Sequence, residues 1–164
     1  MKILLATLQQ PLKLTGSPST HPRGISELGL LLDSSIVIDA ERRGKNVAQL
    51  LEDVIAVIGN QKVVISAVGF TELVHAVYRS TNPIMRVRHE QFLRELLYVT
   101  EIVPYTQGTA SLAGRIDAQQ RSIGVTIPSM DLLIGATALE IGYAVVTSNV
   151  RHFRLIPDLR VLSI

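Results

Sequence analysis

Short apolar runs alternate with helical patterns along most of the chain, and this order constrains the fold more than any other feature. From Gly29 onward, each run of three to six mainly apolar residues is followed by a segment whose apolar residues recur at helical spacing. Strand–helix–strand alternation is typical of a mainly parallel sheet with helices on both faces. We therefore predict an α/β fold, a three-layer sandwich with a mainly parallel central sheet, whose strands include residues 30–32, 63–65, 102–104, 143–147 and 159–164.

The intervening segments have the periodicity of amphipathic helices. Apolar side chains recur every three or four residues in each of them, which places those side chains on one face of a helix. The stretch 129–141 is apolar nearly all round, so we expect it to be a buried helix. The other predicted helices lie at 47–58, at about 68–79, around 92–97 and through 112–116.

The first 28 residues differ from the rest of the chain. They contain breaker-rich stretches at 9–11 and 16–22 and show no periodicity. The apolar stretch at 3–8 is too short for the core of a signal peptide. We interpret residues 1–28 as an amino-terminal extension, either flexible or an over-extended start, and residues 29–164 as one domain.

Composition excludes several classes of protein. The chain has no cysteine, which rules out disulfide scaffolds and cysteine-ligated metal sites. No apolar run reaches the roughly 18 residues needed to span a bilayer. With 47% hydrophobic residues in 164, one well-buried domain is feasible. These features predict a soluble protein of the reducing cytoplasm, without a membrane partner.

The charge balance permits a polyanionic partner. The formal net charge is only +2, yet the isoelectric point is about 9.2 and arginine carries most of the positive charge. The forked guanidinium group suits phosphate better than the point charge of lysine. This balance is far weaker than that of a protein that coats nucleic acid.

Asp33 directly follows the first predicted strand. In parallel sheets, ligands bind outside the carboxyl ends of the strands, so a carboxylate at this position can face a ligand. An aspartate that opens a helix can equally accept backbone N–H bonds as a cap. Position alone does not choose between these two roles.

Asp131 lies in the first turn of the predicted buried helix. Gly135 and Ala138 share its face, and such small neighbours let another element approach closely. An ionised carboxylate there needs a partner, namely the helix dipole, an arginine or a metal ion. The simplest interpretation is an acid stabilised by the helix dipole alone.

Glu72 and Asn149 are weaker candidates when each is taken alone. On a helical wheel, Glu72 lies opposite the apolar face and beside His75 and Arg79, as a solvated glutamate would. Asn149 follows the strand that ends at Thr147; its amide oxygen can bind a ligand, although turn formation is its commoner role.

Three acids and one amide, all at strand ends or on helical segments that follow them, could converge on one cleft. Clustered carboxylates repel each other and are normally tolerated around a hard cation. Ligation by oxygen alone selects Mg²⁺ or Mn²⁺ over zinc. Such ions activate water and neutralise the charge of a phosphodiester.

Four motifs in order resemble those of PIN-domain proteins, in particular the VapC-type toxins of toxin–antitoxin pairs. The resemblance covers residues 29–164, and the order and spacing of the motifs carry it more than any single motif does. The motifs are LLDSSIVID at 31–39, ISA at 65–67 with TEL at 71–73, DLLIGATA at 131–138 and VTSNVRHF at 146–153.

The resemblance implies a metal-dependent endoribonuclease that uses Mg²⁺ or Mn²⁺. The metal would be held by Asp33, Glu72 and Asp131, and Asn149 would position water or the scissile phosphate. The resemblance therefore implies that the helix face carrying Glu72 lines an active-site groove and does not face bulk solvent. Supporting positions around the metal ligands are assigned to Ser35, Asp39 and Thr147.

The resemblance also implies partners. RNA is the expected substrate, and a structured RNA such as tRNA is consistent with cleavage at unpaired bases. A cognate antitoxin would cover the acidic cleft, and the apolar helix surfaces suggest a homodimer. Candidate contacts to the RNA backbone are Arg42, Arg43, Arg86, Arg88, Arg151 and Arg154, about half of which an ordinary solvated surface would explain.

The sequence departs from the family pattern after the last interior strand. Many members carry a fourth acid there, whereas this chain has Asn149 and no carboxylate before Asp158. A second metal ion is therefore not predicted. The alternative that this leaves open is a catalytically inactive PIN-like module that binds RNA or protein.

Two other enzyme classes and the nucleotide-binding modules lack their required residues. A phosphoacceptor receiver domain needs a late lysine, but the last lysine is Lys62. A haloacid-dehalogenase-type phosphatase needs a second aspartate where this chain has Ser35. No glycine-rich phosphate loop follows a strand.

Overall fold

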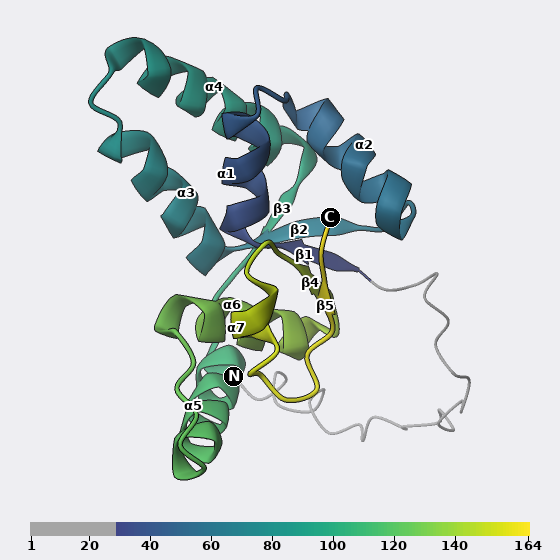
Figure 1. The fold of residues 1–164 in the computed structure, drawn as a ribbon, viewed down its shortest axis with the longest axis vertical. Helices are drawn as coiled ribbons and strands as arrows, with labels where there is room; N and C mark the ends of the chain where they lie inside the picture. The colour runs from purple at the N-terminus through teal and green to yellow at the C-terminus, as the bar shows by residue number, and fades with distance from the viewer. Residues whose placement is uncertain (1–28) are drawn as a thin grey trace, which may run out of the picture.

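The computed structural model describes residues 29–164, which form a five-stranded, all-parallel sheet in the order β3-β2-β1-β4-β5 (Figure 1). The predicted amino-terminal extension lies outside the described residues. Each parallel neighbour is reached by a helical crossover. The strands are β1 (Leu30–Leu32), β2 (Val63–Ser66), β3 (Glu101–Val103), β4 (Ala144–Val146) and β5 (Val161–Leu162).

Seven helices connect these strands and cover both faces of the sheet. Figure 1 shows α1 to α4 on one face and α5 to α7 on the other. The predicted three-layer α/β sandwich is thereby confirmed. The helices are α1 (Ser34–Arg42), α2 (Val47–Ile58), α3 (Ala67–Arg79), α4 (Pro83–Val99), α5 (Gln107–Ser122), α6 (Ser129–Ile141) and α7 (Val150–Phe153).

Strand β1 is central and fully buried, and its side chains alternate between two cores. Leu30 and Leu32 pack in the core beneath α1 to α4, together with Leu96. Leu31 points to the opposite core, where it joins Ile134. This alternation explains why three consecutive leucines suit a strand that is covered on both faces.

Helix α6 is buried as predicted, and the segment that follows α7 packs closely against it at Gly135. A Cβ atom built on Gly135 would lie 2.3 Å from Ile156 Cδ1 and 3.1 Å from Leu159 Cδ2. The segment after α7 can therefore approach the helix only because residue 135 has no side chain.

Two short helices are absent from the sequence prediction. The apolar run after Asp33 belongs to α1, in which Ile36, Val37 and Ala40 are buried. Helix α7 has only four residues, too few to show a periodicity. Within residues 29–164, no helix has both the length and the apolar character required to cross a membrane.

Candidate active site

Asp33 lies where β1 passes into α1, at the carboxyl edge of the sheet. It occupies the N-cap position with an extended backbone, but its carboxylate makes no capping hydrogen bond. Instead Oδ2 accepts hydrogen bonds from Ser35 Oγ at 2.6 Å and from Thr147 Oγ1 at 2.8 Å. The sequence left two roles for Asp33, a helix cap or a carboxylate at the carboxyl edge of the sheet, and the structure favours the second because the side chain does not cap α1.

The loop between β4 and α7 holds these two hydroxyl groups in place. Thr147 is fully buried, and its Oγ1 accepts the backbone N–H of Asn149 at 2.9 Å. The backbone N–H of Ser148 donates to Ser35 Oγ at 3.1 Å. Because both hydroxyls have their own donors, their protons are directed toward Asp33.

Glu72 faces this same edge from α3. Its Oε2 accepts a hydrogen bond from Ser34 Oγ at 2.6 Å, and the residue is half-buried. The glutamate therefore contacts a neighbouring helix rather than pairing along its own. Sequence reasoning missed Ser34, although it directly follows Asp33.

Asp131 has a partner that the sequence analysis did not identify. Its Oδ2 lies 2.8 Å from Nδ1 of His152, on α7. The other ring nitrogen, Nε2, accepts a hydrogen bond from Arg151 Nε at 3.1 Å. This arrangement leaves the proton of the neutral imidazole on Nδ1, which donates to the carboxylate. The VTSNVRHF motif contains this histidine, but spacing alone gave it no role.

The carboxylates of Asp33, Glu72 and Asp131 come close enough to affect one another. Burial raises the pKa of Glu72, and the charges of Asp33 and Asp131 raise it further, while the Ser34 hydrogen bond opposes the rise. Burial also raises the pKa of Asp131, with a contribution from Asp33 and an opposing one from His152. The cluster thus holds negative charge that nearby cations do not fully offset.

The donor chemistry of the cluster fits a hard divalent cation. It offers carboxylate oxygens only, the ligands that Mg²⁺ and Mn²⁺ prefer. A cation between them would offset both the burial and the mutual repulsion that raise the two pKa values. Within residues 29–164, no three histidine, aspartate or glutamate side chains already lie close enough to surround one ion. Sharing an ion therefore requires these side chains to draw closer than they are in this structure.

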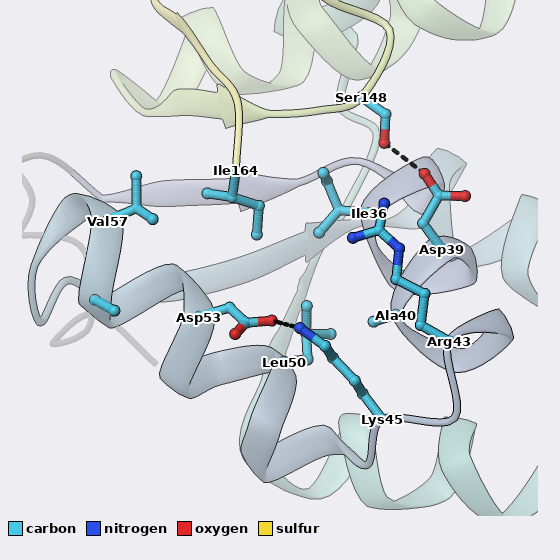
Figure 2. Close-up of a pocket in the computed structure, with 11 residues that line it drawn as sticks. Ile36, Asp39, Ala40, Arg43, Lys45, Leu50, Asp53, Val57, Ser148 and Ile164 are labelled. Carbon is cyan, nitrogen blue, oxygen red and sulfur yellow. Dashed lines mark hydrogen bonds and ion pairs between the residues drawn. The ribbon is translucent and has the colours of Figure 1, made fainter.

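The remaining candidate residues, Asp39 and Asn149, form no side-chain hydrogen bond with Asp33, Glu72 or Asp131 in the described part of the chain. Asp39 accepts a hydrogen bond from Ser148 Oγ at 2.8 Å and faces a separate pocket beside Arg43, as Figure 2 shows. Lys45 and Asp53 pair across the floor of that pocket (Figure 2). Asn149 is exposed, and its side chain does not cap α7.

The six candidate arginines are dispersed over the surface. Arg42 is one of the residues that line a pocket with Glu72, and Arg151 donates to His152, the partner of Asp131. Arg86 is used in the α3–α4 turn, where its Nη2 donates to Ser80 O at 2.9 Å. The other three lie elsewhere: Arg43 and Arg88 line other hollows, and Arg154 is exposed at the end of α7.

Known proteins share both the sequence and the fold. The chain is 30% identical over 137 residues to Ribonuclease VapC1 of Rickettsia felis, covering 84% of this chain and 97% of that protein. It is 29% identical over 130 residues to Ribonuclease VapC19 of Mycobacterium tuberculosis, covering 79% and 96%.

A solved structure of similar fold is that of VapBC2 from Rickettsia felis bound to a DNA fragment from their promoter. It superposes with a TM-score of 0.72 at 22% identity, covering 84% of this chain and 99% of that chain. The family model for the PIN domain matches residues 30–159. The chain therefore belongs to the PIN-domain family.

Proposed function

We propose that this protein is a metal-dependent endoribonuclease and the toxin of a type II toxin–antitoxin pair, acting in the cytoplasm. The observation that carries the proposal is the approach of three carboxylates from β1, α3 and α6, with the pKa of Glu72 and of Asp131 raised. Such a cluster suits an ion that acts on phosphodiesters. The relatives named as ribonucleases support the same chemistry.

Asp33, Glu72 and Asp131 would hold one Mg²⁺ or Mn²⁺ ion. When bound, the ion supplies an activated water and offsets charge on the phosphate. The hydroxyls of Ser35 and Thr147 fix the orientation of the Asp33 carboxylate. His152 does the same for Asp131, as partners of ligating side chains commonly do. Asn149, at the rim, would orient water or the scissile phosphate.

The proposed substrate is a structured RNA, such as tRNA, cut where bases are unpaired. Arg151 and Arg42 are the arginines we assign to its phosphates, because Arg151 donates to His152, the partner of Asp131, and Arg42 lines the pocket that Glu72 also lines. Phosphate contacts give affinity that depends on salt rather than selectivity for bases.

The proposed protein partners are a cognate antitoxin and a second copy of this chain. The antitoxin is suggested by the VapBC structures that share the fold. Exposed apolar side chains on α3 and α4 offer a surface for association, among them Tyr98 at 92% exposed and Ile84 at 75%.

The proposal is tested by cleavage of tRNA and of a mixed RNA pool with Mg²⁺, with Mn²⁺ and with chelator. We expect Asp33→Asn to lower the cleavage rate by more than about 100-fold, since loss of an outer partner of a metal ligand alone costs 10–100-fold. Asp117→Asn is the matched control, because Asp117 pairs with Arg121 on the surface of α5.

Circular dichroism establishes that both variants are folded. Cleavage that survives in folded Asp33→Asn, or that chelator does not abolish, would contradict the metal-site proposal. RNA binding without cleavage by the unaltered protein would identify an inactive binding module instead.

A further inference from the structure

A pocket between α1, α3 and α4 opens directly beside the carboxylate cluster. Its volume is about 400 Å³, and its lining begins at Ser34 and Glu72, the hydrogen-bonded pair at the edge of the site. Ligand pockets are typically of this size or larger. Of the three clustered carboxylates, Glu72 lines this pocket, so the pocket adjoins the site on the side of Glu72.

The lining of this pocket combines an apolar surface with a basic margin. Apolar side chains come from all three helices, including Val37, Ala76 and Leu93. Arg42, Arg79 and His75 also line it, and all three are exposed. An apolar surface bordered by cations suits a group that is flat and uncharged yet attached to phosphates.

The acidic residues of the lining are already engaged. Glu41 contacts His89, and Glu72 accepts the hydroxyl of Ser34. Within residues 29–164, neither Arg42 nor Arg79 forms an ion pair. Arg42 and Arg79 therefore offer positive charge that no ion pair in the described residues uses, and this charge is complementary to a nucleic-acid backbone, while Glu72 keeps its negative charge at the edge toward the cluster.

We propose that this pocket receives the base of one unpaired nucleotide next to the scissile phosphate, while Arg42 and Arg79 contact the flanking phosphates. The inference deepens the proposed function and rests on it. Nucleases of single-stranded RNA segments can bind bases that are splayed out of a loop. A pocket adjoining the cluster on one side would fix which phosphodiester reaches the carboxylates.

The test measures RNA binding in a background that does not need catalysis. Asp33→Asn protein is titrated with a fluorescent hairpin RNA and with variants in which single loop nucleotides lack their base. We expect one base-free position, adjacent to the cleavage site, to weaken binding by about 10-fold, a typical effect for one stacked base.

Ala76→Phe, made in the same background, fills the pocket from α3. We expect it to weaken binding of the complete hairpin by about 10-fold. In this variant, removal of the base at that position should weaken binding further by less than about 2-fold, because the substitution and the missing base remove the same interaction. Ala118→Phe is the matched control, since Ala118 is exposed on α5. Arg79→Gln should lower the slope of log affinity against log salt concentration by about one, the amount expected for the loss of one phosphate contact.

Two results would overturn the pocket assignment. One is equal loss of affinity at the base-free position with and without Ala76→Phe. The other is RNA binding by Ala76→Phe that equals RNA binding without this substitution. If Ala76→Phe also lost binding to a protein partner, the pocket would be a site for that protein and not for RNA. A failure of the proposed function would instead appear as no cleavage by the unaltered protein, which does not enter the binding measurement.

Discussion

The two sides of the carboxylate cluster are built differently. Asp33 is 1% exposed, and two hydroxyls donate to one of its oxygens. Glu72 and Asp131 are half-buried, and one side-chain group is hydrogen-bonded to each. The pKa of Glu72 and that of Asp131 are both raised, chiefly by burial. The first side is held rigidly by the sheet, whereas the second consists of charges held by single contacts on helices.

This difference indicates that Asp33 and the other two carboxylates contribute to the site in different ways. A carboxylate fixed at the end of the central strand provides a stationary point of attachment for an ion. For the two carboxylates on helices, burial and the neighbouring negative charges disfavour the charged form, and a bound cation would offset both effects. The fixed side should therefore matter for folding, and the adjustable side for ion affinity.

The sharpest test of the adjustable side is His152→Ala. Loss of the Nδ1 donor frees Asp131, and we expect Mn²⁺ affinity to fall by about 10–100-fold, the usual effect of removing such a partner. Isothermal titration calorimetry measures the affinity. His152→Asn keeps an N–H donor near the Nδ1 position and should recover most of the affinity. If His152→Ala and the unaltered protein had equal Mn²⁺ affinity, the hydrogen bond from His152 to Asp131 would not contribute to ion binding.

The fixed side is tested by Thr147→Val. Removing the buried hydroxyl leaves Asp33 with one donor, and we expect the free energy of unfolding to fall by about 1–3 kcal/mol, as for hydrogen bonds to charged groups. Thr137→Val is the control, because Thr137 is equally buried but donates to the backbone of its own helix. The control should lose at most about 1 kcal/mol in urea unfolding. Equal losses in both variants would remove the distinction between the two sides.

The smallest expected effect concerns pH. A carboxyl whose pKa is raised by folding contributes stability below its ordinary pKa, and this contribution is lost as pH rises through the raised value. Metal-free Glu72→Gln and Asp131→Asn should therefore melt higher than the unaltered protein at pH 7.5. Solvent screening limits the gain to about 1–3 °C.

The pH dependence of that gain supplies the check. It should vanish near pH 4, where the unaltered carboxyls take up protons. Glu140→Gln should show the opposite sign at pH 7.5, because hydrogen bonds from Thr109 and Thr106 lower the pKa of Glu140. Thermal melts with chelator present measure all three variants. A gain that persists unchanged at pH 4 would mean that charge is not its cause.

The fold was predictable because strand and helix periodicities report burial directly. The strand Leu30 to Leu32, the helix at 129–141 and the edge strand near Val161 follow from the length of each apolar run and from its place in the alternation of strands and helices. Helix α7 escaped prediction, since its four residues make a single turn.

The site was predictable only in part, for a physical reason. Asp33 and Asp131 are located by strand ends and helix starts, which are local features. For Glu72, periodicity separates apolar from polar faces but cannot distinguish solvent from a neighbouring helix. The contact of His152 with Asp131 spans 21 residues and depends on how closely α7 packs, which no spacing encodes. The hydrogen bond from Arg86 to the Ser80 carbonyl is a local turn contact that charge alone did not indicate, and its predicted contact with RNA stays a prediction.

The position of β4 inside the sheet determines when during synthesis this cluster can form. Thr147 follows Asp33 by 114 residues, and His152 comes later still. A ribosome must therefore translate past residue 152 before Asp33 and Asp131 have both Thr147 and His152 as partners. A chain that stops before residue 147 would carry Asp33, Glu72 and Asp131 but neither Thr147 nor His152, so the cluster with all of its partners exists only after these distant segments have been made and folded together.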